Sequence, residues 1–194
     1  VLNVHNSEGV QYAKPKLKIM GIEAVRSSTP KPCRSLIIDT LNVIMNEDEP
    51  AVHKFIENAR KEFNQLPAED VAFPRGVNNL DKYIDSAHIY KKACPIHVRG
   101  ALLYNHYLKQ YDIENKYEQV YSGEKIKFAY LKMPNKFRED VIAFPTIIPD
   151  EFGIREFVDY EKQLDKAYLE PLRTILDAIG WKTEKQHTLE SFFE

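Results

Sequence analysis

The sequence is poor in the residue types that build several common functional sites. Its 194 residues include only two cysteines, Cys33 and Cys94, which lie far apart and lack the paired spacing of a zinc site or a disulfide framework. Glycine is also scarce, at seven residues, and none of it forms a phosphate-binding loop of the GxGxxG or Walker type. We therefore expect reduced, intracellular thiols and no nucleotide site of those two kinds.

The sequence also lacks long apolar runs and a strong overall charge. No run approaches the roughly 20 apolar residues that a membrane-spanning helix needs, so no membrane contact is expected. Net charge is −2, but residues 1–34 hold six basic and two acidic residues, whereas residues 35–70 hold three and eight. Residues 71–110 hold six basic and two acidic residues, and residues 150–194 hold six basic and eleven acidic residues. Two basic segments separated by acidic ones predict one basic face on a nearly neutral protein.

The acidic and histidine residues show no catalytic pattern. Two-metal catalysis needs carboxylates that hold ions about 3.5–4 Å apart. Asp39-Thr40-Leu41-Asn42 lies in a predicted amphipathic helix, and Glu47-Asp48-Glu49 is typical of a solvated loop. His88, His97 and His106 recur every nine residues, which puts neighbours on opposite faces of a helix. The sequence predicts no catalytic residue, metal ligand or cofactor in this chain, so a small metal-dependent nuclease is the hypothesis with least support.

Apolar residues are plentiful, at 43% of a chain long enough for one domain, or for one domain and a piece of another. Helical periodicity and proline positions predict four helices. The last of these is expected to kink at Pro171 and to end at a capping Gly180. The predicted helices run from Pro30 to about residue 46, from Pro50 to before Pro67, and over residues 94–107 and 159–179.

Strand patterns are shorter. Residues 125–132 alternate as a strand does, with residues 141–144 as a candidate partner. Residues 1–13 predict a hairpin that turns near Ser7-Glu8-Gly9, and residues 71–79 predict a loop. The fold class expected from these elements is α+β, mainly helical, with a small β element and an N-terminal β-hairpin.

The most informative stretch runs from Lys14 to Arg34. Lys16 and Lys18 alternate with apolar residues as on a half-buried strand, and Gly21 permits a tight bend. Thr29 then predicts a helix N-cap ahead of Pro30. The stretch holds one acid and six basic residues: Lys14, Lys16, Lys18, Arg26, Lys31 and Arg34.

A helix N-terminus with hydroxyl groups and cations beside it favours an anion. We therefore expect a polyanion across the strand and the helix start; a solvated basic strand with an ordinary capped helix is the alternative. A second basic cluster combines Arg75-Gly76-Val77-Asn78-Asn79, Lys91-Lys92 and His97-Val98-Arg99-Gly100. Arginine and asparagine beside glycine suit a phosphodiester backbone, although a solvated loop explains the same residues.

Three segments carry a specific resemblance: KLKIMGIE with RSSTPK, FPRGVNN, and CPIHVRGALLYN. In that order they resemble family B DNA polymerases, closest to those of T-even-type bacteriophages, where the palm gives way to the thumb. The resemblance implies a palm remnant over residues 1–29 and a thumb domain over residues 30–182. It also implies DNA contacts from Lys16, Lys18, Arg26, Ser27, Ser28, Thr29, Lys31, Arg75, Gly76, Asn78, Lys92, His97 and Arg99.

The last residues, 183–194, carry a separate motif. Gln186, Leu189, Phe192 and Phe193 have the glutamine, aliphatic and double-aromatic spacing of a sliding-clamp-binding peptide. In a tight three-residue turn, Leu189 and Phe192 share one face with Phe193 beside them, as a plug for a hydrophobic pocket. Docking of the two phenylalanines on their own domain is the alternative.

These observations lead to two functional hypotheses. The first is the C-terminal part of a phage-type DNA polymerase, or one half of a split enzyme, which binds a primer-template duplex, a sliding clamp and an N-terminal polymerase portion. The resemblance implies Mg²⁺ in that complete enzyme and the cytoplasm of an infected bacterium as its location. The start at Val1, in an apparent strand, agrees with a piece of a longer protein. The second hypothesis is a stand-alone, non-catalytic, clamp-tethered DNA-binding module.

Overall fold

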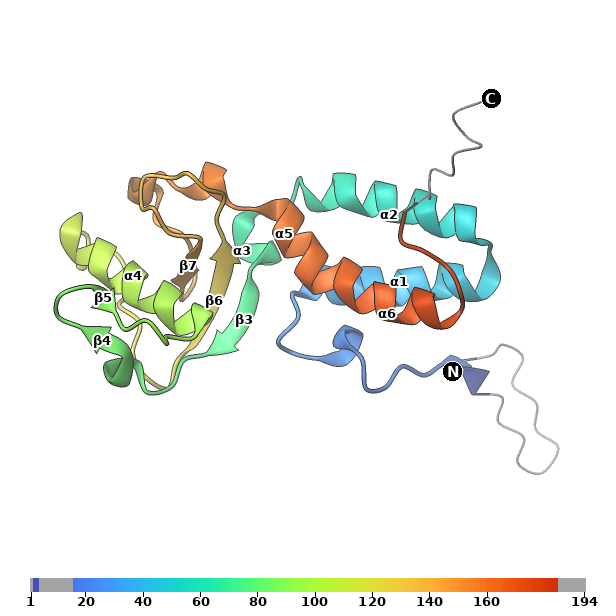
Figure 1. Ribbon diagram of the computed structural model, residues 1–194, viewed down its shortest axis with the longest axis horizontal. Coiled ribbons are helices and arrows are strands. Elements are labelled where there is room, and N and C mark those ends of the chain that lie inside the picture. Colours follow the sequence, from blue (N-terminus) through green and yellow to red (C-terminus); the bar gives the residue numbers. More distant parts are fainter. Residues whose placement is uncertain (1, 4–15, 185–194) are drawn as a thin grey trace.

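A helical part and a sheet part lie end to end in the computed structural model, which describes residues 2–3 and 16–184 (Figure 1). The helical part contains α1 (Lys31–Asn46), α2 (Glu49–Phe63), α5 (Tyr160–Leu164) and α6 (Glu170–Ala178). The sheet part contains α4 (Ile96–Gln110), β3 (Phe73–Gly76), β6 (Lys125–Tyr130) and β7 (Val141–Phe144), with a small hairpin of β4 (Ile84–Asp85) and β5 (Ile89–Tyr90). The short helix α3 (Ala68–Val71) joins the two parts. The predicted α+β, mainly helical class is confirmed.

The first two helices form where the apolar periodicity predicts them. In α2, Val52, Ile56 and Phe63 are buried along one stripe, and Asp48 caps the helix by accepting from the Ala51 N–H at 3.1 Å. The start of α1 differs from the prediction. Its N-cap is Pro30, whose backbone is extended (ψ 141°), and Thr29 is a buried residue one position earlier. Packing of Thr29 into the protein therefore replaces the predicted capping role.

The last helical stretch is interrupted as its proline predicts. A π-helical turn over Asp165–Leu169 separates α5 from α6, and the Glu170 N–H donates to the carbonyl of Asp165, five residues earlier. Pro171 lacks an N–H and cannot continue the ordinary α-helical ladder, so the wider turn precedes it. Gly180 adopts φ +79° just after α6, and the Trp181 N–H donates to the Leu176 carbonyl at 2.9 Å. The capping role predicted for Gly180 is confirmed.

The sheet contains a strand that the sequence did not predict. Strand order is β3-β6-β7, all antiparallel, and the β6–β7 pair agrees with the prediction. Residues 73–76, predicted as part of a loop, instead form the edge strand β3, with Phe73 opposite Phe128 and Gly76 opposite Lys125. Pro74 is compatible with a strand only because β3 is at the edge, where one side of the ladder needs no N–H donor. This strand joins the basic residue Arg75 and its neighbour Gly76 to the rest of the sheet.

Helix α4 covers the sheet at very short range. An ideal Cβ built on Gly100 would lie 2.8 Å from the Ala143 backbone nitrogen, so only glycine permits this approach of α4 to β7. The sequence analysis associated Gly100 with approach to a phosphodiester backbone. The structure corrects this interpretation, because Gly100 is buried against the sheet.

Buried polar side chains join the helical part to the sheet part. Gln163 in α5 is fully buried; its Nε2 donates to the Val71 carbonyl at 2.7 Å and its Oε1 accepts from the Tyr130 N–H at 3.0 Å. In the helical part, the hydroxyls of Thr40 and Tyr168 are hydrogen bonded at 2.7 Å. Buried hydrogen bonds of this kind are costly to break. Those of Gln163 therefore hold the helical part and the sheet part in one arrangement.

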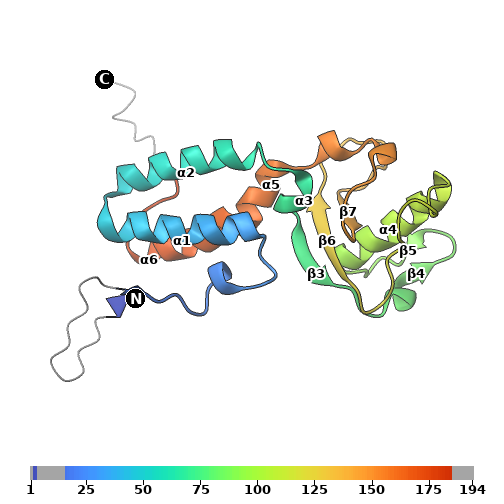
Figure 2. The ribbon, with the colours of Figure 1, turned by 180° about the vertical axis from the view of Figure 1, so that it is seen from behind.

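At the N-terminus, β1 (Leu2–Asn3) pairs antiparallel with β2 (Lys16–Leu17), so the partner strand lies beyond the predicted hairpin of residues 1–13. The turn predicted near Ser7-Glu8-Gly9 lies outside the described residues. The chain continues beneath α1 and α6, with Gly21 at φ +76° in the expected bend (Figures 1 and 2). In the described ranges, 2–3 and 16–184, no helix is both long enough and apolar enough to span a bilayer.

The contact between α4 and β7 predicts a strong effect of one methyl group. Gly100→Ala should lower the free energy of unfolding by about 1–2 kcal/mol, because overpacking against the Ala143 backbone outweighs the helix propensity gained. Urea unfolding followed by circular dichroism measures this. Gly76→Ala is the matched control, since no atom lies within 4 Å of its added Cβ. Equal stability of the two variants would contradict the close packing of α4.

Candidate nucleic-acid interface

The first basic segment lies directly against the edge strand. Arg75 in β3 donates from Nη1 to the Ser28 carbonyl at 3.2 Å and to the Pro74 carbonyl at 3.3 Å. These bonds join two segments 47 residues apart and orient the guanidinium group. Ser27 and Arg26 next to this contact are exposed, and Arg26 is paired with Glu23 at 2.9 Å. The structure therefore brings Arg75 and Gly76, from the second basic cluster, beside the first basic segment.

Three hollows adjoin one another around this contact. We call them the inner, the edge and the outer hollow and define each by its lining residues. The inner hollow, about 510 Å³, is lined by residues that include Arg26, Ser28, Thr29, Arg75, Lys166 and Glu170. The edge hollow, about 320 Å³, is lined by Ser27, Ser28, Pro74, Arg75, Gly76 and Lys125. The outer hollow, about 480 Å³, is lined by residues that include Pro30, Lys31, Arg34, Pro74 and Lys127. Ser28 and Arg75 are common to the first two, and Pro74 is common to the last two.

The charges in these hollows differ. The inner hollow contains two acids, Glu23 and Glu170, beside its three cations. The charged residues of the edge hollow are both cations, Arg75 and Lys125. Its lining also includes two serine residues and the exposed backbone of Gly76. Hydroxyl groups, cations and an accessible backbone are the groups that bind phosphate oxygens. The edge hollow is therefore the best anion-binding surface among the three.

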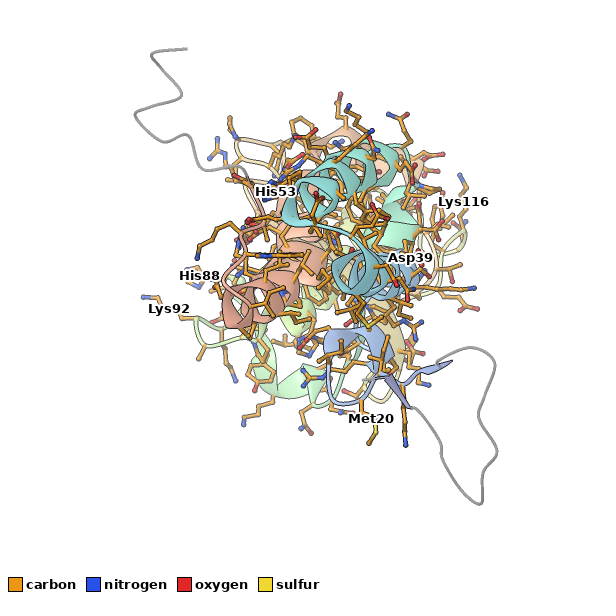
Figure 3. All side chains as sticks on the ribbon, turned by 90° about the vertical axis from the view of Figure 1, so that its right-hand side faces the viewer. Met20, Asp39, His53, His88, Lys92 and Lys116 are labelled. Carbon is orange, nitrogen blue, oxygen red and sulfur yellow. The ribbon has the colours of Figure 1, made fainter. Side chains whose placement is uncertain are left out.

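The other predicted contact residues are more widely placed. Lys18, Asn78 and Lys92 are exposed and line none of the three hollows. Figure 3 shows that Lys92 protrudes on a different side of the molecule from Met20, which belongs to the basic segment. Lys16 lies in β2, and its side chain is outside the described part of the structure.

His97 and Arg99 at the start of α4 have partners within the protein. His97 is half-buried beside Phe128, with ring centroids 6.4 Å apart; burial, and then the charge of Arg75, lowers the pKa of its imidazole. Arg99 is ion-paired with Asp140 and lies over the Tyr90 ring, 5.7 Å from its centroid. His97 is thus near the interface, whereas the Arg99 guanidinium is already engaged on another face of the helix.

Sequence reasoning missed several residues of these hollows. Lys125 and Lys127 alternate with the buried Ile126 and Phe128, so their exposure was predictable. Their place beside the basic segment was not, because it depends on the pairing of β6 with β3. Lys166 likewise enters the inner hollow only through the packing of the π-helical turn. Arg34 belongs to the predicted basic stretch but was not predicted to contact DNA.

Within residues 2–3 and 16–184, no three histidine, cysteine, aspartate or glutamate side chains are grouped so as to hold a metal ion. Asp39 is exposed on α1, as Figure 3 shows, and its neighbour Thr40 is hydrogen bonded in the core. Burial raises the pKa of the Cys33 thiol to about 12, which leaves it unreactive. The predicted clamp-binding residues, Gln186, Leu189, Phe192 and Phe193, lie outside the described residues.

Comparison with known proteins finds two related phage proteins. The chain is 30% identical over 196 residues to the DNA-directed DNA polymerase of Enterobacteria phage T4, covering 99% of this chain and 21% of that protein. It is 34% identical over 199 residues to the DNA-directed DNA polymerase of Escherichia phage RB69, covering 100% and 21%. The chain thus spans about a fifth of the length of these relatives. No profile of a known protein family matches it. The resemblance to T-even-type phage polymerases is confirmed.

The position of Arg75 near His97 predicts a measurable coupling. Arg75→Ala should raise the pKa of His97 towards the ordinary histidine value of about 6.5, because a nearby positive charge disfavours the imidazolium form. Because the pKa of His97 is lower in the folded than in the unfolded chain, the unfolded chain binds more protons near these pKa values. The neutral His97 therefore contributes to the free energy of unfolding above about pH 6.5, and this contribution is lost as the pH falls through the unfolded and then the folded pKa. Titration of the His97 imidazole by NMR measures the shift. Lys92→Ala, near His97 in sequence, should leave it unchanged.

Proposed function

We propose that this chain, related over its whole length to part of the T-even-type phage DNA polymerases, is the part of such an enzyme that grips the primer-template duplex and tethers it to a sliding clamp. The observation that carries the proposal is the contact of Arg75 with the Ser28 carbonyl, which joins the first basic segment to the edge of the sheet. The names of the relatives, DNA-directed DNA polymerases, support DNA as the polyanion.

In this proposal the duplex lies with a phosphodiester strand along the edge hollow. Arg75 and Lys125 neutralise phosphates, Ser27 and Ser28 donate from their hydroxyl groups, and Gly76 permits close approach of the strand to the backbone. Arg26 and Lys166 extend the positive surface along the inner hollow. Such contacts position a duplex without reading its sequence, as a polymerase requires, because it must process every sequence.

The catalytic step belongs to another part of the enzyme in this proposal. The N-terminal polymerase portion supplies the carboxylates that hold Mg²⁺, in a family B type of active site. Residues 1–29 then form the end of the palm and residues 30–182 the thumb. By itself this chain is predicted to be inactive in nucleotide addition. The whole enzyme acts in the cytoplasm of the infected bacterium.

The tail supplies the tether. Gln186, Leu189, Phe192 and Phe193 bind a hydrophobic pocket on the clamp, while the edge hollow binds DNA. Two separate contacts joined by one chain raise the local concentration of DNA at the enzyme. The competing function is a stand-alone, clamp-tethered DNA-binding module. Mixing this chain with an N-terminal polymerase portion distinguishes them, because restored DNA synthesis requires the split-enzyme role.

Removing one cation of the interface should weaken duplex binding uniformly across sequences. For Arg26→Ala we expect the slope of log affinity against log salt, about −5 for six phosphate contacts, to become shallower by about 0.9. Fluorescence anisotropy with two duplexes of different sequence, over a series of salt concentrations, measures both properties. Arg173→Ala is the matched control, since Arg173 is also exposed and paired with a nearby acid, Asp165, at 2.7 Å. Duplex affinity that barely responds to salt would contradict the proposal.

The two functions of the chain should be separable. Replacing Phe192 and Phe193 with alanine should abolish clamp binding, because the hydrophobic plug is lost, and should leave duplex affinity within about twofold. Surface plasmon resonance with immobilised clamp, and anisotropy with duplex, measure the two affinities. Replacing the nearby exposed Lys182 and Glu184 with alanine serves as the control. Equal loss of both affinities would argue that the phenylalanines dock on their own domain.

A further inference from the structure

The outer hollow has a composition that differs from the rest of the interface. It lies on the opposite face of the sheet from the Phe73–Phe128 stack, since Pro74 and Lys127 are opposite each other in the strand register. Lys31, Arg34 and Lys127 line it against a single acid, Asp70. Three cations and one carboxylate leave an excess of two positive charges. The three cations come from two elements, α1 and β6, so the excess arises from folding.

Two of these cations have hydrogen-bonding capacity to spare. In the described part of the chain, no hydrogen bond or ion pair engages the Arg34 side chain, and its Nε is a buried donor without a partner. Lys127 donates from Nζ to the Glu69 carbonyl at 2.8 Å, which uses one of its three donors. The terminal Nη groups of Arg34 and the remaining Nζ donors of Lys127 are therefore available to an anionic ligand in the hollow.

Proline rings form the apolar part of the same hollow. Pro30, Pro32 and Pro74 line it, and each presents a rigid, apolar surface that has little conformational entropy to lose on binding. The volume, about 480 Å³, is within the range of sites for small organic ligands. An apolar wall facing a cluster of cations matches a ligand with a flat apolar portion and an anionic group. A bare phosphate would leave the proline wall without a contact.

We propose that the outer hollow is a binding site for one nucleoside phosphate, with the phosphate on Arg34 and Lys127 and the base or sugar against the prolines. The Ser35 hydroxyl, also in its lining, and the N-terminus of α1 add favourable contacts for the phosphate. The ligand is either a free nucleotide or an unpaired nucleotide of a DNA strand. This site adjoins the edge hollow at Pro74 but shares none of its cations, so its proposal does not depend on the proposed grip on the duplex.

The test is a titration of the full chain with thymidine monophosphate to ~10 mM, followed by NMR. Saturable shifts are expected at Ala72 and Ser35, with weaker binding of inorganic phosphate and none of thymidine. Arg34→Gln and Lys127→Met should each weaken binding about tenfold, the effect of one charge-assisted hydrogen bond. Lys125→Met is the matched control on the same strand, and it should reduce duplex binding but leave nucleotide binding unchanged. Lys127→Met preserves the test if Arg34→Gln fails to fold.

A single-stranded oligothymidylate distinguishes the two sources of the ligand. If Lys127→Met weakens binding of the oligothymidylate as strongly as it weakens binding of thymidine monophosphate, the site holds a nucleotide of a DNA strand. If the variant weakens binding of thymidine monophosphate only, the site holds a free nucleotide. Either result supports the proposal. It is overturned if thymidine monophosphate does not saturate, if inorganic phosphate binds equally well, or if neither variant weakens binding. Failure of duplex binding with intact nucleotide binding would overturn only the proposed grip.

Discussion

The pairing of one short edge strand with its neighbour determines the whole candidate interface. When Phe73–Gly76 pairs with Lys125–Tyr130, Arg75 comes within hydrogen-bonding distance of the Ser28 carbonyl, and Lys125 comes beside it. The cations of the edge hollow come from different strands, Arg75 from β3 and Lys125 from β6. The sheet brings them together, because Gly76, the neighbour of Arg75, lies opposite Lys125 in the strand register.

The helical part gives this edge its rigid support. Gln163 hydrogen bonds to α3 and β6 at once, and the π-helical turn before Pro171 lets the last helical stretch follow both the sheet and α1. A basic groove built across two packed parts holds its cations at fixed spacing, so less conformational entropy is lost when a polyanion binds. The edge hollow and the outer hollow adjoin at Pro74, but no cation lines both of them.

Similarity to the phage polymerases and the geometry of the chain support the same proposal in different ways. The similarity extends over the whole chain and over about a fifth of the length of the relatives. The geometry indicates which surface of the chain carries its charge. It also shows that Arg99, one of the predicted contacts, is engaged with Asp140, so a matching motif does not ensure a free side chain.

The sequence by itself determined the helices apart from the capping of α1, and also the capping at Gly180, the β6–β7 pair and the two basic clusters. Periodicity and local residue chemistry encode each of these features. It did not determine the strand at residues 73–76, where proline and glycine indicate a loop and only the partner strand makes an edge strand stable. It did not determine the convergence of Arg75 and Ser28 or the burial of Gly100 either. Contacts between residues tens of positions apart depend on packing, and only the tertiary structure decides them.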